Sequence, residues 1–330
     1  MKETLLCCRI TAQEKGLYRL CHDGVEQAAQ VSGKFQYEAL GPSDYPTVGD
    51  EVLADLNGGG QAVIHKVLPR KSLFLRKAAG TAREEQPVAA NVDILFLCMA
   101  LNNDFNLRRL ERYLAAAWNS GATPVVVLTK ADLCGNPSEK VAAVEEAASG
   151  TDVLLTSAAQ EDGIRPLLPY LTPGRTVAFV GSSGVGKSTL MNGLLGKEIL
   201  ATGGLRNDDR GRHTTTRRQM FFLPGGAALI DTPGMRELGL WDSESGLETA
   251  FADIEALARQ CRFQDCRHEK EPGCAVRAAL ASGELSEERF RSWQRLSAEN
   301  RYADDRAAHM SAKEKKFRMI AQFNKSNSKR

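Results

Sequence analysis

The sequence predicts a multi-domain protein with an N-terminal β-barrel, a central α/β domain and a C-terminal, mainly helical domain that binds zinc. Three observations predict this order. Short strand-like runs fill roughly the first 70 of the 330 residues, strands alternate with helices from about residue 88, and Cys and His residues cluster late in the chain. The expected domains are 1–75, 76–242 and 243–330.

The composition is that of an ordinary globular protein, with 42% hydrophobic residues, 25% charged residues and a net charge of +2. We find no signal-peptide pattern and no apolar run near the ~20 residues of a membrane span. We therefore expect a cytoplasmic protein without a membrane partner. In that compartment the eight cysteines are not expected to form disulfides.

The N-terminal barrel is expected from short runs separated by Gly and Pro. The expected strands are 5–10, 16–21, 35–40, 51–56 and 61–68, with a turn at 57–60. Five strands in so short a span favour an OB-fold, a barrel that often binds oligonucleotides. A lid or spacer role stays open. The basic segment 69–77 either contacts RNA phosphates or is a solvated linker.

The central domain alternates strands and helices, which predicts a mostly parallel sheet whose ligand lies at the C-terminal strand ends. The expected strands are 92–100, 124–128, 152–155, 176–180 and 227–230, and the expected helices are 106–120, 138–148 and 188–195. After about residue 243 the chain reads as helical. Its last 18 residues, 313–330, carry seven Lys or Arg against one Glu, which predicts a basic tail.

Residues 181–189 fit the phosphate-binding pattern G-x-x-x-x-G-K-[ST] between an expected strand and an expected helix. The glycines let successive N–H groups point at phosphate oxygens, Lys187 reaches the β- and γ-phosphates, and Ser188 ligates Mg²⁺. The loop comprises Gly181, Ser182, Ser183, Gly184, Val185, Gly186, Lys187, Ser188 and Thr189.

Residues 129–132 fit [NT]-K-x-D, a pattern that reads guanine. Guanine presents two neighbouring N–H donors, and the Asp132 carboxylate accepts both. Lys130 lies along the base, and Thr129 belongs to the same motif. Adenine leaves a buried Asp132 unsatisfied, at a cost of about 1–3 kcal/mol. The segment with Ser157 and Ala158 resembles a second base-contacting loop, although an ordinary loop fits it nearly as well.

Two further segments are expected to sense the γ-phosphate. Asp231 and Gly234 fit D-x-x-G, in which Asp231 holds Mg²⁺ through water and the Gly234 N–H meets the phosphate. We assign the second Mg²⁺ ligand to Thr215, although the spacing leaves Thr214 and Thr216 open. The polar stretch 202–212 is expected to order when nucleotide binds.

The sequence lacks the glutamine that orients the attacking water in many GTPases, because Met235 occupies its position. Intrinsic turnover should therefore be slow or use another group. His213 is the nearest candidate, and an exposed loop histidine is the alternative.

The motif order is unusual, because the base-reading residues precede the phosphate loop. A circular permutation preserves the sheet while changing this order. It also makes the D-x-x-G segment lead directly into the C-terminal domain, so that nucleotide state can move that domain.

Four late residues have the spacing of a structural zinc site. Three thiolates and one imidazole form a closed tetrahedral set without an open position for catalysis. The set is Cys261, Cys266, His268 and Cys274.

With these motifs the chain resembles, over nearly its whole length, the circularly permuted small-ribosomal-subunit biogenesis GTPases known as RsgA or YjeQ. Residues 90–93, 129–132, 181–189, 211–216 and 231–237 carry the resemblance, together with the zinc set. It implies an OB-fold, a permuted GTPase domain and a zinc domain in this order, with GTP or GDP, Mg²⁺ and one Zn²⁺ as cofactors. The family also replaces the Gln by a hydrophobic residue.

The resemblance further implies slow GTP hydrolysis that the small ribosomal subunit stimulates, with rRNA as the contact. It implies a catalytic role for His213, and from the motifs we also assign Lys187 and Thr215 to the catalytic residues. We expect a monomer without a DNA partner. The alternative is an RNA-binding module switched by nucleotide, on this or another RNA, in which turnover is incidental.

Overall fold

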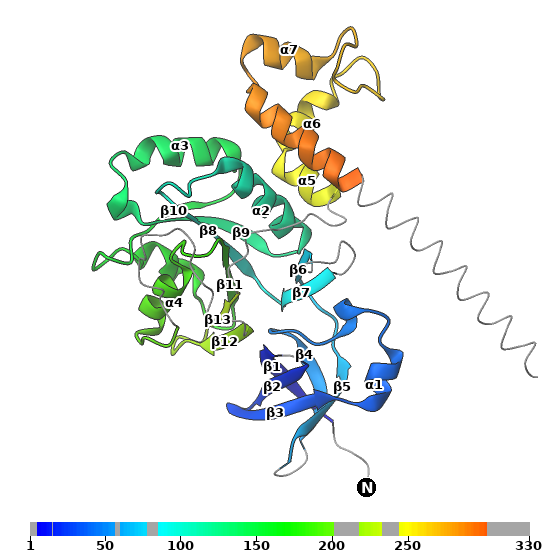
Figure 1. Ribbon diagram of the computed structural model, residues 1–330, viewed down its shortest axis with the longest axis vertical. Coiled ribbons are helices and arrows are strands. Elements are labelled where there is room, and N and C mark those ends of the chain that lie inside the picture. The colour runs from blue at the N-terminus through cyan, green and yellow to red at the C-terminus, as the bar shows by residue number, and fades with distance from the viewer. Residues whose placement is uncertain are drawn as a thin grey trace, which may run out of the picture. The chain divides into compact units, whose positions relative to one another are not determined.

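The computed structural model describes residues 5–14, 16–56, 60–77, 85–200, 218–232 and 244–301. The chain divides into two compact units, Met1–Gly239 and Leu240–Arg330 (Figure 1). The first unit contains the barrel and the α/β sheet, and the second is helical. The three expected domain bounds stay predictions. Residues 57–59 of the expected turn at 57–60, the polar stretch 202–212 and the basic tail lie outside the described residues.

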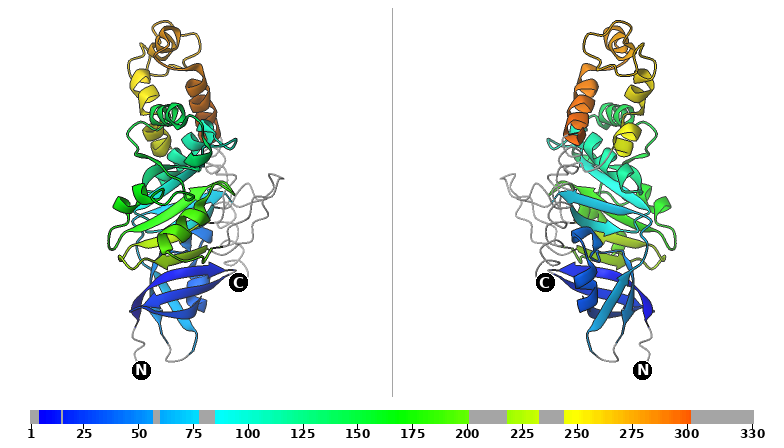
Figure 2. Two further views of the ribbon diagram at one scale, coloured as in Figure 1. Left: turned by 90° about the vertical axis from the view of Figure 1, so that its left-hand side faces the viewer. Right: turned by 90° about the vertical axis from the view of Figure 1, so that its right-hand side faces the viewer.

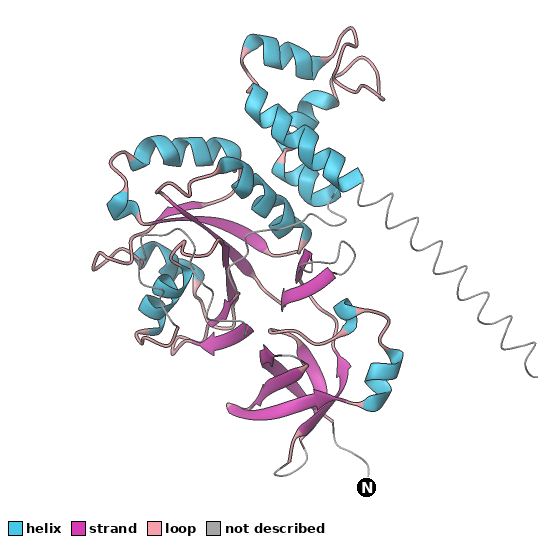
Figure 3. Cartoon of the chain, viewed as in Figure 1, coloured by secondary structure: helices cyan, strands magenta, loops and turns pink. Residues whose placement is uncertain are grey.

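The N-terminal barrel closes because its first strand pairs with both its second and its fourth. The strand order is β1-β2-β3-β5-β4, with β3 and β5 parallel, which confirms the expected OB-fold type (Figure 3). The strands are β1 Leu6–Glu14, β2 Leu17–His22, β3 Val25–Val31, β4 Glu51–Asp55 and β5 Ala62–Val67. The buried side chains of Ile10, Leu20, Val52 and Ile64 form its core.

One expected barrel strand is wrong. Residues 35–40 fall mostly in helix α1, Gly33–Glu38, because the Ser32 hydroxyl accepts the Phe35 N–H at 3.1 Å and starts the helix. The third strand is β3 instead. Its sequence, Val-Glu-Gln-Ala-Ala-Gln-Val, carries little apolar signal, and pairing with β2 and β5 determines its structure. A short 3₁₀ helix, η1 Pro42–Asp44, follows α1.

The central sheet has five parallel strands in the order β10-β9-β8-β11-β13, followed by antiparallel β12. The strands are β8 Ile94–Ala100, β9 Thr123–Thr129, β10 Val153–Leu155, β11 Thr176–Gly181, β12 Arg218–Phe222 and β13 Ala228–Asp231. The helices are α2 Leu107–Asn119, α3 Pro137–Ala147 and α4 Lys187–Leu195, with 3₁₀ turns η2 Ala131–Leu133 and η3 Arg165–Tyr170. All the expected central elements are present, and β12 is additional.

The core of the central sheet is aromatic at its middle. Phe96 on β8 and Phe179 on β11 lie on neighbouring strands, with ring centroids 5.2 Å apart in an edge-to-face arrangement. Both are fully buried. Strands buried on both faces explain the near-continuous apolar runs of β8 and β9.

The barrel and the central sheet form one continuous sheet of eleven strands. Strand β1 pairs antiparallel with β12, with Gln13 opposite Arg218 (Figure 2). The Arg9 guanidinium adds a 2.6 Å hydrogen bond to the Thr176 hydroxyl. A separate hairpin of β6 Leu73–Lys77 and β7 Glu85–Ala90 connects the two parts. Residues 73–77 of the basic segment 69–77 thus form a paired strand.

The second unit consists of α5 Glu244–Ala250, α6 Ala252–Ala258, α7 Ala275–Ser282 and a helix over residues 287–301. Arg289 joins the last helix to α6, because its guanidinium donates two 2.7 Å hydrogen bonds to the Asp253 carboxylate. The same guanidinium lies 4.8 Å from the centre of the Phe251 ring. Among the described helices, none has the length and hydropathy needed to cross a membrane.

Candidate nucleotide and metal sites

The phosphate loop leaves the C-terminal end of β11 and runs into α4, as the motif predicts. Gly184 and Gly186 have φ angles of 75° and 106°, which favour glycine. A Cβ atom on Gly181 would lie 2.5 Å from the Cys98 carbonyl oxygen on β8. Close packing therefore requires glycine at position 181, and backbone conformation favours glycine at positions 184 and 186.

Lys187 lies at the first position of α4 and is only 7% exposed. Its ammonium group donates to the carbonyl oxygens of Gly181 and Ser182 at 2.8 and 2.9 Å. Burial lowers the pKa of Lys187, and the nearby Asp231 and Asp104 carboxylates act against this shift. A buried cation held over the loop is suited to phosphate oxygens, which add the negative charge that the site lacks.

The guanine-reading motif and the phosphate loop are hydrogen-bonded to each other. The Thr129 hydroxyl donates to the Val185 carbonyl at 2.5 Å, and the Lys130 ammonium donates to the Gly184 carbonyl at 2.7 Å. Lys130 has a φ of 57°, a left-handed conformation that ends β9 and starts η2. Segments more than fifty residues apart thus form a single site.

Asp132 and the second base-contacting loop also meet. The Ser157 hydroxyl donates to Asp132 Oδ1 at 2.5 Å, and the Ala131 N–H donates to the Thr156 carbonyl at 3.1 Å. Ser157 is buried, whereas Ala158 is exposed. Asp132 is exposed, so the expectation of a buried carboxylate is wrong. The side chain stands at the rim, where a base would cover it.

Asp231 ends β13 beside the phosphate loop and is 5% exposed. Burial raises its pKa to about 6, although Lys187 acts in the opposite direction. The next residue, Thr232, donates through its hydroxyl to the Phe179 carbonyl at 2.5 Å and fixes the strand end. Such a carboxylate becomes fully ionised when a cation is near.

The remaining predicted site residues are of two kinds. Ser188 and Thr189 lie in the first turn of α4, and Ser183 lies within the loop. The other predicted residues lie outside the described residues, namely His213, Thr214, Thr215, Thr216, Gly234 and Met235. Their roles stay predictions.

Asp104 is a site residue that sequence reasoning missed. It follows β8 at the same sheet edge, and its Oδ2 accepts the Ser182 hydroxyl at 2.6 Å. Arg109 on α2 pairs with Asp104 Oδ1 at 2.9 Å and so orients the carboxylate. Its position after a buried parallel strand was the available signal, because that is where ligand-site residues gather.

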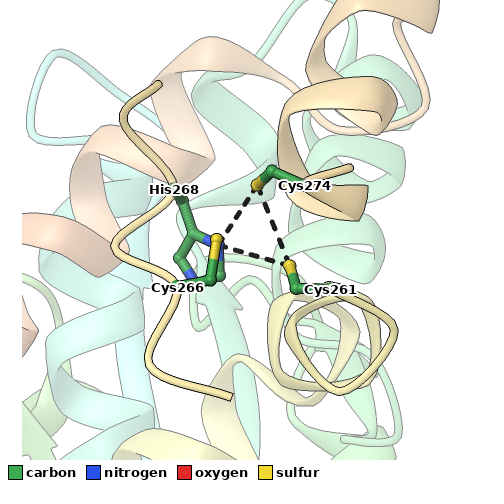
Figure 4. Close-up of side chains that lie close together, drawn as sticks. All are labelled: Cys261, Cys266, His268 and Cys274. Atoms are coloured by element: carbon green, nitrogen blue, oxygen red, sulfur yellow. Dashed lines mark hydrogen bonds between the residues drawn. The ribbon is translucent and has the colours of Figure 1, made fainter. Parts of the chain in front are cut away.

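The predicted zinc residues converge in the second unit (Figure 4). The ligand atoms of Cys261, Cys266, His268 and Cys274 all lie within 4.8 Å of one another, and the cysteines are free thiols. Zn–S bonds of about 2.3 Å and a Zn–N bond of about 2.0 Å would place tetrahedral ligand atoms roughly 3.5–3.8 Å apart.

The observed separations match that geometry. Cys261 Sγ lies 3.8 Å from Cys274 Sγ and 3.6 Å from His268 Nδ1. His268 Nδ1 lies 3.4 Å from Cys274 Sγ. Burial lowers the pKa of His268, which favours the neutral imidazole that a metal needs. The ring of Trp293 lies 5.7 Å from the His268 ring and covers it.

The chain is similar to known proteins in both sequence and fold. A family model described as "RsgA GTPase" matches residues 67–241. An "ABC transporter" model matches residues 167–329, which include the phosphate loop. The "Small ribosomal subunit biogenesis GTPase RsgA 2" of Lactiplantibacillus plantarum is 50% identical over 89% of this chain and 83% of its own length. The RsgA of Methanosarcina acetivorans is 45% identical over 93% of this chain and 82% of its own length.

Two solved structures share the architecture. YjeQ from Thermotoga maritima is similar with a TM-score of 0.66 and 28% identity, covering 89% of this chain and 97% of that one. YloQ, described as a circularly permuted GTPase, is similar with a TM-score of 0.62 and 22% identity, covering 92% of this chain and 96% of that one. The second likeness concerns the fold alone.

Proposed function

The chain belongs to the RsgA GTPase family, and from this premise we propose that it assists late maturation of the small ribosomal subunit while hydrolysing GTP to GDP and phosphate. The observation that carries the nucleotide part is the pair of hydrogen bonds from Thr129 and Lys130 to the phosphate loop. These bonds unite base recognition and phosphate binding, as a guanine nucleotide requires. The ribosomal part rests on the printed names of close relatives.

The proposed roles follow from chemistry and position. The loop N–H groups and Lys187 hold the phosphates, and Lys130 and Asp132 select guanine. Ser188 and Thr215 ligate Mg²⁺, and Asp231 contacts it through water. Bound Mg²⁺ neutralises charge that develops on the phosphates. The buried Lys187 supplies a second positive charge that water does not screen.

We further propose that the four-residue cluster holds one structural Zn²⁺. The spacing of the sulfur and nitrogen atoms supports this, together with the absence of a carboxylate or open ligand position in the set. The segment between α6 and α7 has few buried apolar side chains, so a metal would contribute folding free energy there. This role is structural rather than catalytic.

The partner is proposed to be rRNA of the small subunit, contacted by the barrel and by the second unit. We place the protein in the cytoplasm as a monomer, with neither membrane nor DNA as a partner. The barrel topology supports RNA contact, because OB-folds commonly bind oligonucleotides. His213 is proposed to assist hydrolysis in place of the residue that Met235 replaces.

The second candidate is an RNA-binding module in which nucleotide acts only as a switch, on this or another RNA. Met235 favours it, because methionine cannot orient water. The two candidates differ in turnover. The first requires that ribosomal subunits accelerate hydrolysis, whereas the second requires only that nucleotide change RNA affinity.

The test is steady-state hydrolysis of GTP and ATP by the full chain, with and without small ribosomal subunits. We expect slow GTP turnover that rises many-fold with subunits, and no ATP turnover. Lys187→Ala should lose nucleotide binding or turnover. Unchanged GTP turnover in the presence of mature and immature subunits would exclude the ribosomal proposal while leaving the nucleotide site intact.

A further inference from the structure

A pocket of about 410 Å³ lies between the barrel, strand β12 and the β6–β7 hairpin. Tyr18 and Tyr45 of the barrel line it together with several prolines, and Arg218 lines it from β12. It shares no residue with the phosphate loop or the guanine motif. Gln219, the neighbour of Arg218, is paired with Asp231, so the pocket lies along the same sheet edge as the nucleotide site.

Arg218 is a buried cation with few partners. Its side chain is 7% exposed, and one amino group donates to Gln13 Oε1 at 3.2 Å. Among the described side chains, no carboxylate pairs with it. Burying a guanidinium is costly unless an anion or several acceptors compensate for the lost water. Among the described residues, this side chain makes no other hydrogen bond. Its remaining donors are not fully enclosed, so a ligand in the pocket that Arg218 lines can reach them.

The two glutamines at the pocket do not supply that compensation. Gln13 Oε1 also accepts the Thr47 hydroxyl at 3.1 Å, so this oxygen already serves two donors. Gln86 Oε1, from β7, accepts two bonds from the Arg76 guanidinium at 2.8 and 2.9 Å. Both acceptors are neutral and occupied. The pocket therefore presents positive charge.

Arg76 adds a second cation beside the first. It lies on β6, bound to a pocket-lining glutamine, and no described carboxylate pairs with it. Burial lowers the pKa of Arg218, and with the smaller effect of the neighbouring Arg76 charge this pKa is about 10. Arg218 lines the pocket, whereas Arg76 is held by the lining residue Gln86 and does not itself line the pocket. An anion in the pocket would be stabilised by both positive charges.

The shape and lining of the pocket indicate which anion. The volume of the pocket exceeds that of a single ion, and its walls include Tyr18 and Tyr45. The Phe35 ring packs edge-to-face against the Tyr45 ring, with the two ring centroids 5.7 Å apart. Guanidinium forks match phosphate oxygens, and aromatic and proline walls accept a ribose or base. A phosphate attached to an organic group fits this combination better than a simple halide.

We propose that this pocket binds a phosphate group through Arg218, with Arg76 as a second positive charge nearby, at the junction of the barrel and the GTPase sheet. The source is either the backbone of an RNA strand or a free phosphate compound. In the RNA case the inference rests on the proposed function and gives the rRNA contact a defined anchor beside the nucleotide site.

The experiment uses the full chain saturated with GDP, so that the phosphate loop is filled. One probe is a short fluorescein-labelled single-stranded RNA followed by anisotropy. The other is inorganic phosphate followed by the melting temperature. The variants are Arg218→Gln and Arg76→Gln. The control is Arg19→Gln, which removes an exposed barrel arginine paired with Glu26 at 3.6 Å.

If RNA is the source, Arg218→Gln weakens RNA binding by at least about tenfold, and Arg19→Gln has a much smaller effect. If a free phosphate compound is the source, phosphate raises the melting temperature of the wild type but not of Arg218→Gln, and RNA binding is unchanged. If neither probe distinguishes Arg218→Gln from the wild type, the proposal is wrong. If Arg218→Gln does not fold, Arg76→Gln, which changes a half-buried arginine, is tested in its place with the same expected outcomes.

These results are separable from the proposed function. Subunit-stimulated GTP hydrolysis by the wild type tests the latter alone. A wild type that binds phosphate through Arg218 yet is not stimulated by subunits would retain the pocket and remove the ribosomal role.

Discussion

The Ser157 hydroxyl donates to Asp132 Oδ1 at 2.5 Å across 25 residues of sequence. This bond orients the Asp132 carboxylate and leaves its other oxygen and remaining lone pairs for a ligand. Because Ser157 is buried and Asp132 is exposed, the buried partner fixes the exposed one. The carboxylate that we propose to read the base is thus oriented in the absence of nucleotide.

Asp132→Ala should remove the preference for guanine. The carboxylate is expected to accept two N–H groups of the base, so GTP affinity should fall roughly 10- to 100-fold while weak ATP binding is unchanged. Competition between GTP and ATP for a fluorescent nucleotide measures this. Asp162→Ala, which changes an exposed carboxylate in the following loop, is the control. Unchanged selectivity in Asp132→Ala would remove the assignment.

Gly163→Ala should displace the loop that holds Ser157. An added Cβ atom would lie 1.7 Å from the Ser157 carbonyl oxygen, so the backbone must move. We expect a loss of about 1–3 kcal/mol in stability and weaker GDP binding, because Ser157 would no longer orient Asp132. Thermal melting and GDP titration measure the two effects. Gly135→Ala, where nothing lies within 4 Å of an added Cβ, should have little effect on either.

Asp104 should act on nucleotide affinity in two separable ways. Asp104→Asn keeps an acceptor for the Ser182 hydroxyl and removes a negative charge near the phosphates, so it should bind GDP at least as tightly as the wild type. Asp104→Ala loses the hydrogen bond as well and should bind roughly 3- to 10-fold more weakly than Asp104→Asn. Equal affinities of the two variants would show that the bond does not position the loop.

The stability of the nucleotide-free, metal-free protein should depend on Asp231 between about pH 4 and pH 6. Burial raises the pKa of this carboxyl from 3.8 to about 6, so the folded state binds a proton that the unfolded state has released. Stability from this group is therefore greatest below pH 4 and falls as pH rises through 6, by roughly 3 kcal/mol.

Asp231→Asn cannot titrate and should lack this dependence. The difference in unfolding free energy between variant and wild type, measured by urea denaturation in EDTA, should change with pH across that window. The variant should gain relative to the wild type as pH rises. A difference that is constant from pH 4 to pH 7 would contradict the raised pKa.

Removing zinc should unfold the second unit selectively. Cys266→Ser leaves three ligands, so zinc content per chain should fall well below one and the helices of that unit should melt first. Metal analysis and circular dichroism measure the outcome, and chelation of the wild type should reproduce it. Cys134→Ser, which changes a free cysteine outside the cluster, should retain the metal. A stable, metal-free wild type would falsify the zinc assignment.

Much of the site could be predicted because its chemistry depends on local spacing. Lys187 and Thr129 belong to short motifs whose neighbours are consecutive in sequence, and the four zinc ligands lie within one short segment. Buried parallel strands such as β8 can also be predicted, because both of their faces need apolar residues and the sequence therefore shows a continuous apolar run. These features require no knowledge of distant contacts.

The features that were missed depend on tertiary contacts rather than on the residues of the segment itself. Strand β3 is rich in Glu, Gln and Ala, and its structure follows from its neighbours rather than from its own residues. Asp104 belongs to no motif, and only the fold brings it to Ser182. The exposure of Asp132 likewise follows from the loop path. Pairing partners far apart in sequence leave no periodic signal in either strand.

The pairing of β1 with β12 also bears on how the chain is made. Gln13 and Arg218 are 205 residues apart, so at about 5–20 residues per second the first is synthesised roughly 10–40 s before the second. The five barrel strands can close on themselves during that interval, since β1 pairs with β2 and β4. The end of β1 that contains Ala12 and Gln13 still presents unpaired backbone groups on one side until β12 emerges, and such edges attract other chains. A nascent chain stalled before residue 218 should therefore be the form most prone to aggregate.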